Sequence, residues 1–395
     1  MNQWDLDVTV KNSIDEVQDR WNKLVPNETF AQGKYLKTLE RTNQDNLQNL
    51  YVLLSRDGED VAAVLLQVLV LKMGDSFNYD NYTTDRSFWS RQWQRIRQWF
   101  VSLITFRMLT VGNLYLTGQY GIHFDEQHFA KDVQFDIVNA LLKKLKKELC
   151  NTPYRFQGIL YKDFFTDQTP SSATDLGLIP FTIDPNMILQ VRPSWQSFED
   201  YLLDMRSKYR VRMKNAIRKF KGVERRTLSH DDIVSLATEM YALYRQILDG
   251  SGFVLAMGKE EYFRVLKEEL NDDLVVTGYF LEGRLIGFYT WVMEGEKMDS
   301  HFIGFEKSIN MKYQLYLNIL MDLVKASIEQ KATSLYYYRT ALEIKSSVGA
   351  EPHEMFCYFK HTNSFLNKFV VPTSFKYFVP KQSWKQRHPF KALES

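Results

Sequence analysis

Two stretches of the chain follow the same order of elements, and this weak internal repeat limits the folds that the sequence can adopt. Each stretch opens with two apolar runs joined by a turn that contains an acidic residue and a glycine, at 50–71 and at 274–293, which predicts a β-hairpin. Each continues with a further strand, a long amphipathic helix and another strand. The repeat therefore predicts an α+β protein built from two similar units in tandem.

The two units differ mainly by an insertion in the first. We expect the later elements of the first unit at 108–117, 126–149 and 155–160, and those of the second unit at 297–305, 311–331 and 334–338. The insertion, at about 73–107, separates the first hairpin from its helix. Pro170, Pro180 and Pro185 punctuate the joint between the units, as a linker would. We therefore place the first domain at 1–185 and the second at 186–395.

Composition points to a folded protein of a reducing compartment. Hydrophobic residues make up 45% of the chain and aromatic residues 14%, which is too much for a disordered protein. Cys150 and Cys357 cannot build a disulfide framework. The first residues lack the features of a secretory signal, and the longest apolar block, Val61–Leu71, is too short to span a bilayer. We expect a soluble, cytoplasmic protein.

Positive charge is concentrated in the segment Met205–Arg226. It holds ten Lys and Arg residues against the one acid Glu224, a net charge of +9 in a protein whose total is +2. Apolar residues recur at helical spacing at Tyr209, Met213, Ile217 and Phe220, and cations follow on the neighbouring face at Arg206, Arg210, Lys214 and Arg218. A solvated face is the alternative, but such faces mix charge signs to gain ion pairs. The pattern favours a helix that faces an anionic partner such as nucleic acid.

The insertion carries a second basic segment. From 87 to 107 there are four Arg residues, no acid, and the three residues Trp89, Trp93 and Trp99. A basic amphipathic helix rich in Trp can lie on an anionic membrane surface. Packing of this helix on its own domain, with the Trp rings in the core, is the alternative. The segment leaves a peripheral membrane contact open.

Three groups of local motifs accompany the repeat. They are Trp21–Leu24 followed by Phe30–Glu40; Phe198–Leu202 followed by Lys208–Lys214; and Gly304, Tyr313–Tyr316, Tyr338–Lys345 and Gly349. With the order of elements, they resemble the FemAB-like acyl and aminoacyl transferases, which have two GNAT domains. The resemblance implies two tandem GNAT-like domains, each a mixed, mostly antiparallel, twisted sheet flanked by helices, with the second domain as the active one.

The resemblance also implies N-acyl transfer, which needs a base for the attacking amine and a site that polarises the donor carbonyl. In GNAT folds the donor lies where the fourth strand parts from the fifth, beside the following helix. The implied bases are Asp299 and His301, which alternate on one face of a strand, and Glu306 just beyond it. The implied donor contacts are Phe302, Gly304, Lys307, Lys312, Tyr313 and Tyr316, and the implied acceptor contacts are Tyr338, Arg339 and Lys345.

One stretch departs from the common GNAT pattern and leaves the donor open. Members that bind acetyl-CoA hold its pyrophosphate with a Gly-rich loop, whereas Lys307–Leu315 contains no glycine. FemAB-like proteins that use aminoacyl-tRNA also lack this loop. Three hypotheses follow: an N-acyltransferase that takes its acyl group from acyl-CoA or a carrier thioester, an aminoacyl-tRNA-dependent ligase that extends a peptidoglycan precursor, and a non-catalytic protein that binds nucleic acid or an anionic membrane.

The sequence gives little support for a metal site. His353, Cys357 and His361 are spaced by four, as metal ligands on a helix would be. The run 355–359 nevertheless has the pattern of a strand, and no fourth ligand accompanies the three. We therefore expect no metal.

Overall fold

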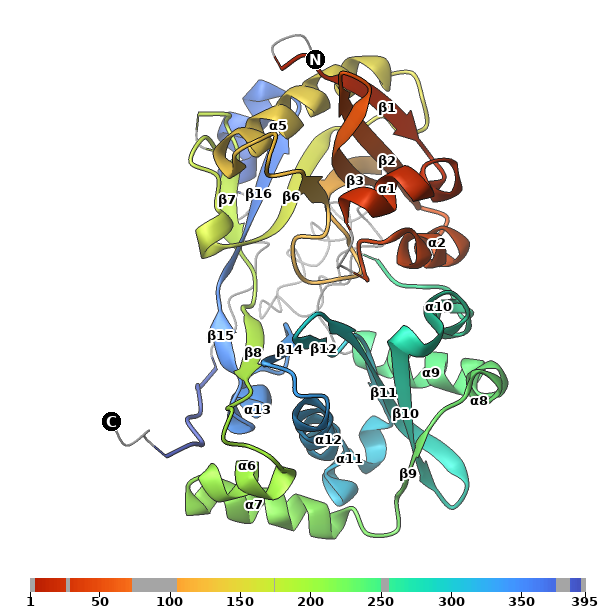
Figure 1. Cartoon of the computed structure of the whole chain (residues 1–395), viewed down its shortest axis with the longest axis vertical. Coiled ribbons are helices and arrows are strands. Elements are labelled where there is room, and N and C mark those ends of the chain that lie inside the picture. The colour runs from red at the N-terminus through yellow and green to blue at the C-terminus, as the bar shows by residue number, and fades with distance from the viewer. Residues whose placement is uncertain are drawn as a thin grey trace, which may run out of the picture.

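Each half of the chain forms a mixed sheet covered by helices in the computed structural model of the protein (Figure 1). The structure describes residues 4–25, 29–72, 105–173, 175–249, 256–373 and 384–391. Within these residues each sheet has eight strands. The first runs in the order β1-β2-β3-β4-β6-β16-β7 with β5 beside β3, and the second in the order β15-β8-β14-β12-β11-β10-β9 with β13 beside β11.

The elements have the following bounds. The first half contains β1 Asp7–Lys11, α1 Gln18–Leu24, α2 Gly33–Thr42, β2 Leu47–Arg56, β3 Glu59–Lys72, β4 Thr105–Val111, β5 Ile122–Phe124, α5 Lys131–Glu148, β6 Gly158–Phe165 and β7 Ile179–Thr182. The second half contains β8 Asn186–Gln190, α6 Phe198–Asp204, α7 Ser207–Lys219, β9 Glu224–Thr227, α8 His230–Ser235, α9 Ala237–Leu248 and α10 Tyr262–Leu270. It continues with β10 Leu274–Leu281, β11 Arg284–Glu294, β12 Lys297–Asp299, β13 Ile303–Phe305, α11 Lys307–Tyr313, α12 Leu315–Glu329, β14 Ser334–Tyr338, α13 Leu342–Ser347, β15 Glu351–His353 and β16 Met355–His361.

Both predicted hairpins are confirmed. β2 and β3 are joined by Asp57 and Gly58, whose φ angles are 52° and 84°, and β10 and β11 by Glu282 and Gly283, at 54° and 79°. Two consecutive left-handed residues match the twist of the strands that they connect, so this turn type is favoured in hairpins. An acidic residue followed by glycine is therefore a sufficient local signal at both corners.

Two predicted elements of the second half are each divided in the structure. The strand expected at 297–305 consists of β12 and β13, because residues 300–302 bulge out of the ladder. The helix expected at 311–331 begins earlier, as α11, and is interrupted at Gln314, which has a φ of 52°. A left-handed residue cannot continue an α-helix, so α12 starts anew at Leu315.

The C-terminal strand β16 returns to the first sheet. It lies between β6 and β7, pairing Phe359 with Leu160 and Phe356 with Thr182, and in Figure 1 it runs upward from β15 into the first half. The division at 185/186 separates β7 from β8, but it places β16 with the wrong sheet. A boundary drawn from linker composition cannot detect this, because pairing between distant strands is set by tertiary packing.

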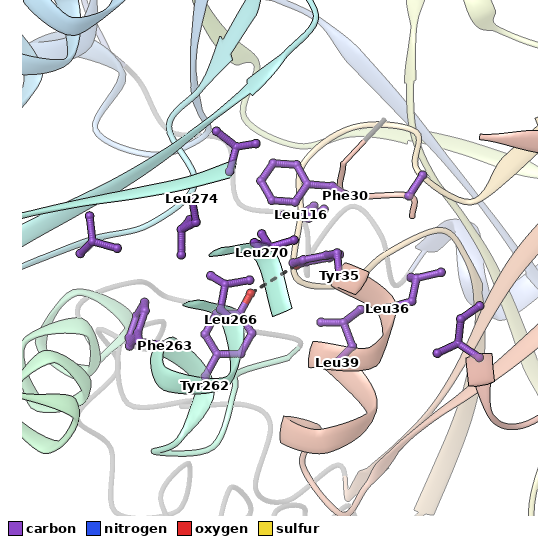
Figure 2. Packing of buried hydrophobic residues seen from close by; sticks show 14 of the residues in the cluster. Phe30, Tyr35, Leu36, Leu39, Leu116, Tyr262, Phe263, Leu266, Leu270 and Leu274 are labelled. Atoms are coloured by element: carbon purple, nitrogen blue, oxygen red, sulfur yellow. Dashed lines mark hydrogen bonds between the residues drawn. The ribbon is translucent and has the colours of Figure 1, made fainter. Parts of the chain in front are cut away.

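A hydrophobic core continues across the interface between the halves. Figure 2 shows its central part, where α2 faces α10. The contributing buried residues are Phe30, Tyr35, Leu36 and Leu39 from the first half and Tyr262, Phe263, Leu266 and Leu270 from the second. The hydroxyl groups of Tyr35 and Tyr262 lie 3.3 Å apart within this core, and ion pairs between Arg41 and the residues Glu268 and Glu269 border it. Burial of this apolar surface fixes the two sheets relative to one another.

Candidate active site

The candidate site is a bulge in the second sheet, between β12 and β13. Both strands pair with β11. The His301 N–H donates to the Thr290 carbonyl (3.0 Å) and the Thr290 N–H donates to the Phe302 carbonyl (2.8 Å), so two residues oppose one. β12 is parallel to β14 up to the pair of Asp299 and Tyr336, after which β13 pairs with β11. The sheet therefore opens at the bulge.

Asp299 is the carboxyl group at this opening. Its side chain is buried, and Oδ2 accepts hydrogen bonds from the hydroxyl of Tyr338 and, at 3.4 Å, from that of Tyr120. Burial raises the pKa of Asp299 to about 8, and nearby Glu294 also raises it, whereas both tyrosine hydroxyls and Lys297 oppose the rise. A carboxyl group with this pKa gains and loses its proton close to neutral pH, as a general base should.

Three consecutive residues at the bulge keep a buried polar atom that has no hydrogen-bond partner among the described residues. The atoms are Asp299 Oδ1, Ser300 Oγ and His301 Nδ1. An unpaired buried polar group costs about 1–3 kcal/mol, and folded proteins rarely retain one without a reason. Three in succession leave hydrogen-bonding groups at the bulge that a ligand could engage.

His301 lies in an aromatic environment. Its Nε2 is 3.3 Å from the hydroxyl of Tyr262, and its ring centroid is 4.3 Å from that of Phe302 and 4.6 Å from that of Phe30. Burial lowers the pKa of His301 to about 3, so the imidazole is neutral at pH 7 and accepts a proton poorly. These surroundings favour Asp299 over His301 as the base.

Glu306 lies away from the bulge, between β13 and α11. Its carboxylate accepts hydrogen bonds from Ser308 (2.7 Å) and Arg284 (2.6 Å). These contacts lower the pKa of Glu306. A carboxylate that is held ionised by a guanidinium is a weak proton acceptor. The surroundings of Glu306 therefore also favour Asp299 as the base.

The backbone is strained at the last residue of β14 and just after it. Residues 338, 340 and 341 have φ angles of 59°, 70° and 48°, and none is glycine. Such conformations cost about 1–3 kcal/mol each and occur where the surroundings enforce them. Here the ammonium group of Lys345 donates to the carbonyls of residues 337 (2.6 Å), 338 (3.1 Å) and 339 (2.6 Å). The strained turn places the Tyr338 hydroxyl on Asp299, and burial lowers the pKa of Lys345 to about 7.

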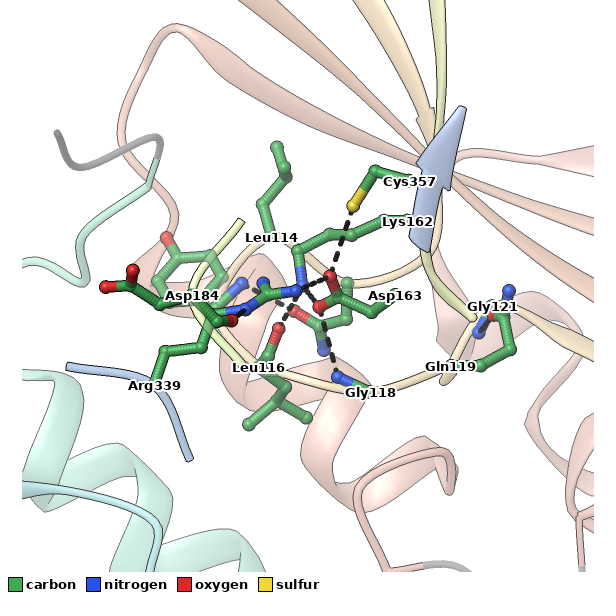
Figure 3. Close-up of polar contacts among 12 residues, drawn as sticks. Leu114, Leu116, Gly118, Gln119, Gly121, Lys162, Asp163, Asp184, Arg339 and Cys357 are labelled. Atoms are coloured by element: carbon green, nitrogen blue, oxygen red, sulfur yellow. Dashed lines mark hydrogen bonds and ion pairs between the residues drawn. The ribbon is translucent and has the colours of Figure 1, made fainter. Parts of the chain in front are cut away.

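Arg339 connects this turn to the first half of the chain. Its Nη2 is 2.6 Å from Asp163 Oδ1, and its Nε donates to the carbonyl of Asp184 (2.8 Å) (Figure 3). Asp163 lies in β6 and also pairs with Lys162. Among the three expected acceptor contacts, Tyr338 reaches Asp299, whereas Arg339 and Lys345 bond to other groups of the chain. Those internal contacts favour structural roles for Arg339 and Lys345.

The six residues expected to contact the donor lie on or near β13, on α11 and in the first turn of α12. Phe302 and Gly304 pack beside α9, where a Cβ on Gly304 would lie 2.4 Å from a Phe288 ring atom. Lys307 and Lys312 are exposed on α11, Tyr313 is half-buried, and the ring of Tyr316 stacks on Phe305 at 5.3 Å. The stretch expected at the position of a Gly-rich loop, Lys307–Leu315, thus consists of the helix α11 and the start of α12.

Side chains already engage two backbone amides at the starts of these helices. The N–H of Lys307 donates to Gln246 Oε1 (3.2 Å), and the N–H of Tyr316 donates to Asn310 Oδ1 (2.9 Å). In a pyrophosphate-binding loop such amides point at the ligand. Their engagement here argues against that mode of phosphate binding.

The basic helix α7 packs against the start of α12. The side-chain amide of Asn318, in the first turn of α12, donates to the carbonyl of Ala216 (3.1 Å). The buried stripe consists of Met213, Ala216 and Phe220. Ile217 was expected in that stripe but is 38% exposed, because the helix presents Ala216 rather than Ile217 to α12.

The four cations expected to face an anion differ in their contacts. Arg206 is exposed, Lys214 pairs with Glu199 of α6 (3.0 Å), Arg210 donates to the Leu203 carbonyl (3.3 Å) and Arg218 donates to Asn215. Between α6 and α7 lies an open groove of about 610 Å³, lined in part by Phe198, Val211, Lys214 and Arg218. The helix therefore combines cations with apolar surface close to the start of α12.

Three other expectations can be placed on the structure. The described residues include no cluster of three or more His, Cys, Asp and Glu that could hold a metal ion, and 355–359 forms part of β16 as predicted. Within the same residues no helix is both long enough and apolar enough to cross a membrane. Of the basic segment 87–107, residues 87–104 lie outside the described part of the chain.

Comparison with solved structures identifies the fold. The chain superposes on FemX with a TM-score of 0.54, over 92% of this chain and 99% of FemX, at 12% identity. The chain has the FemAB-like tandem GNAT fold. It also superposes on the C-terminal domain of a protein from Agrobacterium fabrum described as a lysylphosphatidylglycerol synthetase, with a TM-score of 0.50, over 92% and 97% of the two chains, at 10% identity. Neither a protein-family model nor a curated protein matches the chain in sequence.

The comparison confirms the fold class expected from the sequence. At 10–12% identity it concerns the tandem GNAT fold alone. The chemistry of this chain has to be argued from the bulge and its neighbours.

Sequence reasoning missed several residues of the site. Tyr120 and Glu294 flank Asp299 from two different elements, Ser300 lies beside it, and Tyr262 contacts His301. For Tyr120 a signal was present, because Gly112, Gly118 and Gly121 occur within ten residues and mark an irregular backbone. For the others the sequence contains no comparable signal.

Proposed function

We propose that the protein transfers an acyl or aminoacyl group to an amine at the bulge between β12 and β13. The observation that carries the proposal is the run Asp299-Ser300-His301, in which each residue keeps a buried polar atom without a partner among the described residues. The position of this run, where β12 parts from β14, matches the donor site expected for a GNAT fold.

In the proposed reaction the amine nitrogen attacks the carbonyl carbon of the donor. A C–N bond forms, the bond from that carbon to the carrier sulfur or oxygen breaks, and the amine proton passes to the Asp299 carboxylate. The carrier leaves with the electrons of the broken bond and takes up a proton. The pKa of Asp299, about 8, suits acceptance of a proton near neutral pH. The hydroxyl of Tyr338 holds the carboxyl group in place.

The contacts at the starts of α11 and α12 favour a donor whose carrier is bound by side chains and not by backbone amides. Two helix-start amides are already engaged by Gln246 and Asn310. Lys307 and Lys312 are exposed on α11, and the basic helix α7 packs on the start of α12 through Ala216. An aminoacyl-tRNA, whose phosphates pair with Lys and Arg, fits this surface better than free acyl-CoA does. Arg206, Arg210, Lys214 and Arg218 are accordingly proposed as contacts of the carrier.

The test is a transfer assay with radiolabelled donors and a panel of amine acceptors. Purified protein is incubated with acetyl-CoA or with a mixture of aminoacyl-tRNAs, and label transfer to lysine, alanine and amino-sugar peptides is measured. We expect transfer with aminoacyl-tRNA and a loss of at least about 100-fold in Asp299→Asn, the usual scale for removing a general base. Glu306→Gln is the matched control and should retain activity.

The outcomes separate the hypotheses. Transfer from acetyl-CoA alone would overturn the inference about the carrier and support the thioester hypothesis. Full activity of Asp299→Asn would remove Asp299 as the base. Salt-sensitive binding of tRNA with no transfer from either donor would support a non-catalytic, anion-binding protein instead.

A further inference from the structure

A bulge with the same hydrogen-bond pattern occurs in both halves of the chain, and the differences between the two bulges bear on the role of the first half. In the second half, Thr290 of β11 bonds to the N–H of His301 and to the carbonyl of Phe302. In the first half, Leu65 of β3 accepts from the N–H of Gly112 (3.1 Å) and donates to the carbonyl of Gly121 (2.9 Å). By hydrogen-bond pattern, Gly112 corresponds to His301 and Gly121 to Phe302.

The two bulges differ in what lies between these residues. His301 and Phe302 are adjacent, whereas residues 113–120 separate Gly112 from Gly121. The ends of this loop, here called the bulge loop (113–120), meet so closely that a Cβ on Gly121 would lie 2.3 Å from the Cα of Gly112. Only glycine permits this approach. The strand register also places Thr110 where the second half has Asp299, so the first half lacks the corresponding carboxyl group at that position.

The bulge loop is held by a buried charge cluster (Figure 3). The N–H of Gly118 donates to Asp163 Oδ2 at 3.1 Å, and the ammonium group of Lys162 donates to the carbonyl of Leu116. Asp163 in turn pairs with Arg339, the residue directly after Tyr338. One carboxylate therefore anchors both the loop from the first half and the strained turn of the second.

The anchored loop carries Tyr120 across the interface to Asp299. Its hydroxyl lies 3.4 Å from Asp299 Oδ2, the same oxygen that Tyr338 contacts, and its ring meets that of Phe30 edge-on at 6.1 Å. Two tyrosines, one on each side of the domain interface, thus hold one carboxyl oxygen and leave Oδ1 without a partner among the described residues.

We infer that the first domain has no transfer site of its own and that its bulge loop completes the site of the second, with Tyr120 as a positioning residue for Asp299. The inference rests on the proposed function for its catalytic meaning. Asp163 is the residue that aligns the two tyrosines, because it holds the elements that carry both.

The test follows the titration of Asp299 directly and needs no substrate. Full-length protein labelled with ¹³C at the aspartate carboxyl carbons is titrated by NMR, and Asp299→Asn assigns the signal. The groups facing Asp299 are Tyr338, Tyr120, Glu294, Lys297 and Tyr336. A hydroxyl that donates to a carboxylate stabilises its ionised form, so Tyr120→Phe should move the midpoint of Asp299 upward.

Tyr115→Phe is the matched control. Tyr115 lies in the same loop and also crosses the interface, where its hydroxyl donates to the carbonyl of Met257 (3.2 Å). This variant removes an interface hydroxyl but should leave the Asp299 midpoint unchanged. Asp163→Asn, which frees the loop, should move the midpoint in the same direction as Tyr120→Phe.

An Asp299 midpoint that is the same in Tyr120→Phe and in the unmodified protein overturns the inference, as does an equal shift in Tyr115→Phe. Failure of the proposed function would show differently, as absence of transfer by the unmodified protein despite a Tyr120-dependent titration of Asp299.

Discussion

Asp163 offers the most severe test of how the two halves are joined. It is fully buried, with two cations, Lys162 and Arg339, against its carboxylate and a backbone N–H from Gly118 at 3.1 Å. Asp163→Asn keeps the volume of the side chain but leaves two buried cations without a counter-charge. Removing one partner of a buried ion pair costs about 3–5 kcal/mol, and we expect a loss of unfolding free energy in this range.

Urea unfolding at neutral pH, followed by far-UV circular dichroism, measures the loss. Asp273→Asn is the control, because Asp273 makes an ion pair with Lys34 across the same interface but this pair is half exposed. The exposed fractions of the two side chains are 52% for Asp273 and 48% for Lys34. Exposed pairs contribute about 0–1 kcal/mol. A cost for Asp163→Asn no larger than that of Asp273→Asn would refute the view that this cluster joins the domains.

The pH dependence of stability gives an independent reading of the same residue. Burial alone would raise the pKa of Asp163, but Lys162 and Arg339 outweigh it and lower the pKa to about 2. Its stabilising contribution is therefore complete above the unfolded value near 4 and is lost as pH falls through about 2. The shift corresponds to about 2–3 kcal/mol. The unmodified protein should lose this amount in acid, and Asp163→Asn should lack that part of the loss.

Four further expectations can be checked with single variants. Asp299→Asn should raise the unfolding free energy at about pH 8.5 and lose that advantage toward pH 4. The reason is that the raised pKa of Asp299 makes the unmodified protein less stable as pH rises through about 8. Urea titrations at several pH values measure the difference. Gly121→Ala should destabilise by more than about 1 kcal/mol, since its Cβ would meet backbone, whereas Gly58→Ala at a turn with open space should cost only about that amount. Asn318→Leu should cost about 1–3 kcal/mol in thermal or urea unfolding, because it removes the amide that bonds to α7 and to the break before α12. Arg218→Gln should weaken tRNA binding and reduce its salt slope by about one unit if α7 contacts phosphates, which filter binding at several salt concentrations can measure.

Much of the fold follows from local sequence signals. The two hairpin turns are encoded by Asp57-Gly58 and Glu282-Gly283, and β14 has the bounds expected for it. These elements depend on residues that are neighbours in sequence, so periodicity and turn chemistry suffice. The return of β16 to the first sheet cannot be predicted from local signals, because its partners in β6 lie almost 200 residues away in the sequence.

The candidate site was only partly accessible from sequence. The strand with Asp299 and His301 was found, but the choice between them depends on burial: it raises one pKa to about 8 and lowers the other to about 3. Tyr120 reaches Asp299 from 179 residues away, and Arg339 meets Asp163 across 176. Such contacts arise from the packing of two domains, which no local pattern encodes.

The role of Asp299 as proton acceptor is tested by the pH dependence of kcat/KM for transfer to an amine, compared between the unmodified protein and Asp299→Asn. Ionisation of the amine affects both proteins equally, so a difference between the two profiles belongs to the enzyme. We expect kcat/KM of the unmodified protein to rise with an apparent pKa of about 8 and that rise to vanish in Asp299→Asn. Parallel profiles for the two proteins would contradict Asp299 as the base.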